Sequence, residues 1–130
     1  HDGDLDGNPR TEADQSFMPF LVTPPYPAYP SGHGGLSNSG RSMLERLLGR
    51  GRVSIALSNP ALPAFTLHYT RLRQITDDIA DARVFAGIHF RFDQESAEDM
   101  GGKVARFIHT HYLRCARPGR CGDDEEDDDE

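Results

Sequence analysis

Tyr26-Pro27-Ala28-Tyr29-Pro30-Ser31-Gly32-His33 is one of two stretches on which the interpretation of this chain rests, and Arg83-Val84-Phe85-Ala86-Gly87-Ile88-His89-Phe90-Arg91-Phe92-Asp93 is the other. In the first, Ser31 and Gly32 come just before a run with helical periodicity, so their backbone N–H groups can lie at a helix N-terminus. Helix N-termini bind anions readily. The first stretch therefore predicts an anion site, with His33 beside it as a group that can transfer protons.

The second stretch carries groups of complementary chemistry. The guanidinium of Arg83 is always charged, and its planar fork of donors suits an oxyanion. His89 can serve as a nucleophile or as a metal ligand. Asp93 follows His89 by four residues and could orient its imidazole ring. Together the two stretches predict an oxyanion site flanked by two histidines.

The segments around these stretches have mostly helical patterns. Apolar residues recur at helical spacing in three runs, and glycines end the first run. On the third run the apolar stripe is formed by Met100, Val104, Phe107, Ile108 and Tyr112. Residues 52–57 could form a short extended stretch, and the two prolines within 59–63 predict a loop. Helices are expected over residues 34–48, 71–86 and 93–113.

The formal net charge of −7 comes from one short segment. Residues Asp123 to Glu130 are all acidic and contribute −8, so the rest of the chain has a balance of +1. Such a segment repels itself and can bury nothing, so we expect a disordered, solubilising tail over residues 115–130. The basic residues of the body are scattered along the sequence without interleaved aromatics, so no nucleic-acid partner is expected.

No apolar run approaches the about 20 residues of a membrane span, so no membrane partner is expected and a soluble protein is favoured. No signal peptide is visible, but the chain begins at His1 without a Met, so secretion stays open. Cys115 and Cys121 flank a Pro-Gly turn. They could form a small disulfide loop in an oxidising compartment or remain free thiols.

The two stretches resemble the second and third signature motifs of the type 2 phosphatidic acid phosphatase superfamily, P-S-G-H and R-x-x-x-G-x-H-x-x-x-D. The longer string Pro-Ala-Tyr-Pro-Ser-Gly-His is most similar to the vanadium-dependent haloperoxidases. Both motifs in this order are a far more specific signal than either alone. The resemblance runs from about Asp4 to Leu113. It implies an all-α fold, the C-terminal portion of a haloperoxidase-like helical bundle, with an irregular lead-in over 1–30 and a partial helical domain over 31–114.

The resemblance also implies roles for the motif residues. His89 matches the histidine that coordinates vanadium in haloperoxidases and attacks phosphorus in phosphatases, and His33 matches the acid–base histidine. Asp93 matches the carboxylate that follows the metal-binding histidine. The implied cofactor is vanadate, and the residues that match its binding groups are Ser31, Gly32, Arg83 and His89.

The chain departs from the family in two places. The family opens its site with K-x-x-x-x-x-x-R-P, but Lys103 is the only lysine here and Arg117-Pro118 the only Arg-Pro, both downstream of the histidines. We therefore expect the C-terminal part of a longer protein. Such a piece should expose apolar helix faces and could self-associate as a homo-oligomer. The family's usual serine before the arginine is Ala82, which removes one possible hydrogen bond.

The resemblance implies a vanadium-dependent haloperoxidase-like enzyme, in which peroxide bound at vanadate oxidises a halide to hypohalous acid. Its partners would be hydrogen peroxide, a halide and a small organic substrate. Two alternatives stay open: an acid phosphatase with His89 as nucleophile, a phosphate group on its substrate and no cofactor, and an inactive fragment that lacks the Lys and Arg-Pro motif. Tyr26 lies where chloroperoxidases usually carry Phe and bromoperoxidases His, so halide preference is not predicted.

Overall fold

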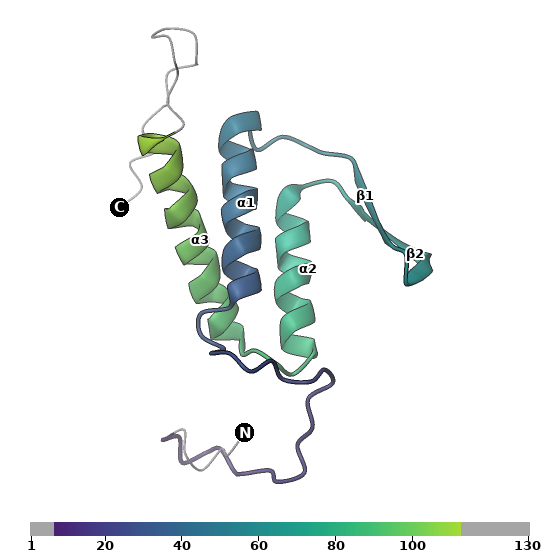
Figure 1. The fold of residues 1–130 in the computed structure, drawn as a ribbon, viewed down its shortest axis with the longest axis vertical. Coiled ribbons are helices and arrows are strands. Elements are labelled where there is room, and N and C mark those ends of the chain that lie inside the picture. Colours follow the sequence, from purple (N-terminus) through teal and green to yellow (C-terminus); the bar gives the residue numbers. More distant parts are fainter. Residues whose placement is uncertain (1–6, 113–130) are drawn as a thin grey trace, which may run out of the picture.

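The computed structural model describes residues 7–112 (Figure 1). Along the chain the elements are α1 (Gly32–Leu48), β1 (Ile55–Asn59), β2 (Leu62–Tyr69), α2 (Leu72–Phe85) and α3 (Arg91–His111). The three helices stand side by side, α1 lies between the other two, and the two strands project away from them (Figure 1). The expectations for the cysteine pair and for the acidic tail concern residues outside the described part.

Helix α1 begins where the sequence supplies a cap. Ser31 has extended backbone, and its hydroxyl oxygen accepts a hydrogen bond from the Gly34 N–H at 3.1 Å. The Ser31 carbonyl accepts the Gly35 N–H at 2.9 Å. A serine cap satisfies amides that have no partner within the helix, which is why the helix starts here. It begins two residues before the predicted start and ends at Leu48, as predicted.

Helices α1 and α3 pack through small residues. A Cβ added at Gly101 of α3 would lie 2.8 Å from both the Gly35 carbonyl oxygen and the Ser39 nitrogen of α1. A Cβ added at Gly34 would lie 2.9 Å from the Ala97 Cβ. The two backbones approach closely because these glycines carry no side chain. Of the predicted apolar stripe of α3, Met100 reaches α1, since its Cε would lie 2.8 Å from a Cβ at Gly35. The five stripe residues are nevertheless 37% to 73% exposed: Met100, Val104, Phe107, Ile108 and Tyr112.

The β-hairpin corrects the prediction of an all-α fold. β1 pairs antiparallel with β2 from Ile55 opposite Tyr69 to Ser58 opposite Thr66. The extended stretch was predicted in part, but β2 was not, because Pro60 and Pro63 indicated a loop. The segment after Pro63 is rich in aromatic and β-branched residues, which favour strands, and a proline is tolerated where a strand has a free edge. The fold is mostly helical with a small two-stranded sheet.

Many of the buried residues of the described part lie near the end of the bundle where α1 and α3 begin. Buried apolar residues are few and mostly small, and six polar residues are buried as well. Of these six, Ser31, His89, Asp93 and Gln94 lie where α1 and α3 begin. Large apolar side chains on every helix are exposed, as the composition predicted. Within residues 7–112 no helix is both long enough and apolar enough to cross a lipid bilayer.

Candidate oxyanion site

The two sequence motifs meet where α1 and α3 begin and α2 ends. The Ser31 N–H donates to the Asp93 carbonyl oxygen at 3.0 Å, which joins the residue before α1 to the first turn of α3. The side chains of Ser31 and Asp93 are fully buried. Residues 62 positions apart in sequence are thus held together by a backbone hydrogen bond.

His89 is held in one orientation by Asp93. The His89 Nδ1 lies 3.2 Å from the Asp93 Oδ2, and each side chain is only 1% exposed. The Phe90 N–H donates to the same carboxylate oxygen at 2.9 Å. A carboxylate accepts hydrogen bonds, so this geometry assigns a proton to Nδ1, and in the neutral form of the ring Nε2 carries the lone pair. The His89 Nε2 is buried and has no hydrogen-bond partner among residues 7–112.

Arg83 lies in the last turn of α2 and supplies the positive charge. Its Nη2 donates to the Tyr26 hydroxyl at 3.3 Å, so the lead-in segment positions the guanidinium. Its Nε is buried and has no acceptor within the described residues. A buried donor without a partner costs about 1–3 kcal/mol, so such groups mark a functional site or an absent partner.

Gly87 makes the turn from α2 to α3 possible. Its φ of +74° lies in the left-handed region that glycine adopts without strain. A Cβ at this position would come within 3.1 Å of the Pro19 Cα, because the lead-in segment packs on the turn. The Leu21 N–H donates to the Ala86 carbonyl at 3.2 Å, which holds the lead-in there. The glycine of the second stretch therefore sets the path between Arg83 and His89.

The start of α1 adds backbone donors and the second histidine. The Gly32 and His33 N–H groups belong to the first turn and have no acceptor in the described part of the chain. The His33 side chain is exposed, and its ring forms no hydrogen bond with another described residue. Tyr29 packs on α3 rather than on the following helix: its ring lies 5.8 Å from that of Phe92.

Gln94 is a site residue that the sequence analysis did not single out. It is buried, and neither end of its side-chain amide has a hydrogen-bond partner within residues 7–112. Its Oε1 would lie 2.8 Å from a Cβ at Gly34, so the amide lies against the start of α1. The one feature of the sequence that could have pointed to Gln94 is its position next to Asp93, at the start of α3.

The donor set fits an oxyanion. It consists of one imidazole nitrogen, one guanidinium and the N–H groups of a helix N-terminus, all of which complement negative oxygen atoms. In the described part, no three side chains of the kinds that chelate a metal cation come together. The buried, unpartnered nitrogens of His89 and Arg83 are the direct observation that supports this fit.

Comparison with known proteins agrees with the fold and the motifs. The family model of the VCPO second helical-bundle domain matches residues 1–118. A bacterial vanadium-dependent iodoperoxidase of known structure superposes with a TM-score of 0.64 at 28% identity, over 73% of this chain and 23% of that one. An apo-type bacterial vanadium-dependent chloroperoxidase, 20% identical, shares the fold with a TM-score of 0.64 over 77% of this chain and 24% of its own. No curated protein matches.

The chain therefore belongs to the family of the VCPO second helical-bundle domain, within the vanadium haloperoxidase superfamily. It spans about a quarter of the length of the solved structures that it matches. The residues described here are thus one helical part of a fold that is larger in those proteins.

Proposed function

We propose that this chain forms the histidine-bearing half of a vanadium-dependent haloperoxidase site. The observation that carries the proposal is the pair of buried, unpartnered nitrogens, His89 Nε2 and Arg83 Nε, at the meeting point of the two motifs. Both groups complement a vanadate oxyanion, and the likeness to an iodoperoxidase at 28% identity supports that ligand. The Lys and Arg-Pro motif that the resemblance implies would come from outside this chain.

In this proposal each residue has a defined task. His89 would hold vanadate through Nε2, because its Nδ1 proton is bound to Asp93 and cannot compete. Arg83 would neutralise the oxyanion charge, and the Gly32 N–H and the Ser31 hydroxyl would donate to its oxygens. Bound vanadate supplies a Lewis-acid centre that activates hydrogen peroxide toward halide. The exposed His33, at the start of α1, would take up and return the peroxide proton.

The test is halide oxidation by the full-length protein. With hydrogen peroxide and iodide or bromide, we expect turnover that depends on added orthovanadate and is lost when excess phosphate competes for the site. The same protein without vanadate is assayed for aryl phosphate hydrolysis, which probes the alternative in which His89 is a phosphoryl-accepting nucleophile. A phosphatase kcat/KM far above that for halide, with no vanadate-dependent oxidation, would replace the proposal by that alternative.

A further inference from the structure

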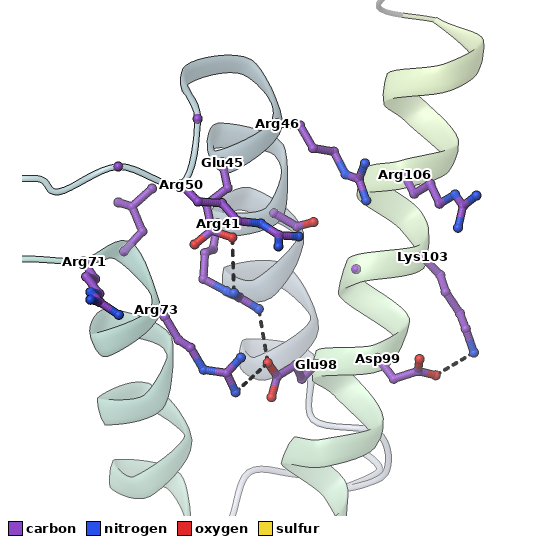
Figure 2. Close-up of a pocket in the computed structure, with 15 residues that line it drawn as sticks. Arg41, Glu45, Arg46, Arg50, Arg71, Arg73, Glu98, Asp99, Lys103 and Arg106 are labelled. Carbon is purple, nitrogen blue, oxygen red and sulfur yellow. Dashed lines mark hydrogen bonds and ion pairs between the residues drawn. The ribbon is translucent and has the colours of Figure 1, made fainter. Parts of the chain in front are cut away.

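A second concentration of charge lies at the other end of the helices (Figure 2). A groove of about 580 Å³ is formed by the last turns of α1, the start of α2 and the middle of α3. Its lining includes seven basic and three acidic side chains, a net charge of +4. Arginines that are scattered in the sequence are gathered here by the packing of three helices.

Some of these charges are paired and some are free. Arg41 contacts Glu98 at 3.1 Å and Arg73 contacts the same carboxylate at 3.1 Å (Figure 2). Lys103 pairs with Asp99. Four exposed arginines have no ion-pair or hydrogen-bond partner for their side chains within the described residues. We call these four the arginine groove: Arg46, Arg50, Arg71 and Arg106.

We propose that the arginine groove binds the acidic segment Asp123–Glu130 of the same chain. Eight consecutive carboxylates are the complement of four unpaired guanidinium groups, since Arg and carboxylate form charge-assisted hydrogen bonds. Binding of this kind needs no folded partner, because a charged segment can engage a surface through many weak contacts. The segment then has a specific binding site beyond its expected solubilising effect.

The covalent connection allows this contact. Arg106 lies six residues before Tyr112, or about 9 Å along the helix at about 1.5 Å per residue. The ten residues 113–122 can span up to about 33 Å. A short connection raises the local concentration of the segment to about the millimolar range. The groove and the segment are therefore within reach of each other, and weak intrinsic affinity is sufficient.

The lining of the groove favours an acidic peptide over a nucleic acid. It contains no aromatic residue, and single-stranded nucleic acids are held by stacking on aromatic rings as well as by charge. It does contain several guanidinium groups at different heights on three helices, which suits carboxylates spaced along an extended chain. The oxyanion site is not involved, because its residues belong to the opposite helix ends.

The experiment uses the whole chain and a fluorescein-labelled peptide of residues Gly122–Glu130. One variant of the chain replaces the acidic residues by their amides: D123N, D124N, E125Q, E126Q, D127N, D128N, D129N and E130Q. The peptide should bind this variant about tenfold more tightly than the wild type by fluorescence anisotropy, because the wild-type segment competes at about millimolar effective concentration. Binding should weaken as KCl is raised.

Matched substitutions then locate the binding site. In the amide variant, Arg46→Gln with Arg106→Gln should weaken peptide binding about tenfold. The control pair, Arg10→Gln with Arg91→Gln, removes the same amount of positive charge at positions outside the groove. It should change the affinity for the peptide less than twofold. Circular dichroism checks that each variant keeps its helices. Equal peptide affinity for the wild type and the amide variant, or equal losses in the two arginine pairs, would overturn the proposal.

Discussion

The two ends of the helices both present groups for anions, but they do so in opposite ways. At the oxyanion end the imidazole of His89 and the guanidinium Nε of Arg83 are buried, and the side chains of His89 and Asp93 are each 1% exposed. At the arginine groove the donors are long, exposed side chains such as those of Arg46 and Arg106. The groups of the oxyanion site are held in place by burial and hydrogen bonds. The side chains of the arginine groove are exposed and are positioned only by the backbone to which they are attached.

The difference in burial between the two sets of donors determines which ligands each end can bind. Buried, preoriented donors act strongly on a small anion because no reorganisation is needed and water does not screen them. Exposed guanidinium groups bind more weakly and lose strength with salt, but they tolerate many arrangements of a long ligand. The first end is suited to chemistry on one atom, and the second to docking of a charged segment.

The strongest test of this contrast is at the two histidines of the oxyanion end. In the full-length protein, His89→Ala should weaken vanadate binding by at least about a hundredfold, since even the outer partners of metal-binding histidines contribute about ten- to a hundredfold. His33→Ala should leave vanadate affinity nearly unchanged and lower turnover by about 10²–10⁴, the range for a general acid or base. Calorimetry and steady-state kinetics measure the two effects.

The control is His68→Ala, on the exposed strand β2, which should change neither quantity. Equal loss of vanadate affinity in the His89 and His33 variants would contradict the division of roles between them. Loss of binding in the His68 variant would indicate a general structural effect.

The next largest effect concerns the packing that holds both ends in place. Gly101→Ala should destabilise the chain by about 1–3 kcal/mol, the usual cost of overpacking, because its Cβ would lie 2.8 Å from the α1 backbone. Gly102→Ala is the matched control: its Cβ meets nothing within 4 Å, so better helix propensity should stabilise the chain by about 0.5–1 kcal/mol. Urea unfolding followed by circular dichroism measures both free energies, and similar values for the two variants would contradict the close approach of α1 and α3.

A smaller effect is expected where an exposed contact supports the buried site. Tyr26→Phe removes the hydroxyl that lies 3.3 Å from the Arg83 Nη2. Loss of this bond should weaken vanadate binding about fivefold, which corresponds to about 1 kcal/mol for a typical hydrogen bond. Tyr29→Phe is the control, because the Tyr29 hydroxyl pairs with Ser96 instead. If the two variants bound vanadate equally, Tyr26 would have no positioning role.

The smallest effect is a pH dependence at the junction of β2 and α2. Burial, then the hydrogen bond to Asp78 and its negative charge, raise the pKa of Tyr69 above its usual value of 10.0. Since the pKa is higher in the folded chain, this contact contributes fully below pH 10 and is lost as the pH rises through the raised pKa. Unfolding free energies at pH 9 and pH 11 should therefore fall more steeply for the wild type than for Tyr69→Phe. Equal slopes would contradict the shift.

Much of the helical framework could be predicted from local sequence. Leu48 was predicted as the end of α1, and the expected span 71–86 exceeds α2, Leu72–Phe85, by one residue at each end. Glycine and the periodicity of apolar residues are local signals, so no distant contact is needed to read them. The strand β2 was missed because its prolines suggested a loop, whereas an exposed two-stranded hairpin has edges that tolerate proline.

The face of a helix that is buried could not be predicted in the same way. The apolar stripe marks one face of α3 in the sequence, but the buried residues of the helix include the small residues Ala97, Gly101 and Ala105. Apolar periodicity shows which residues avoid water, not which surface meets them. Close packing of α1 on α3 depends on glycines that face each other across the two helices, and this pairing is a property of the three-dimensional arrangement.

The motif residues and the chemistry open to them can be read from the sequence, because residue type and spacing at a helix start are local properties. His89 lies four residues before Asp93, just ahead of α3, and Ser31 caps a helix wherever that helix lies. Helix packing, which local sequence does not reveal, brings the Ser31 N–H to the Asp93 carbonyl, Tyr26 to Arg83, and dispersed arginines to one groove. The first two contacts join residues more than fifty positions apart, and separations of this size in sequence are closed by the packing of the helices.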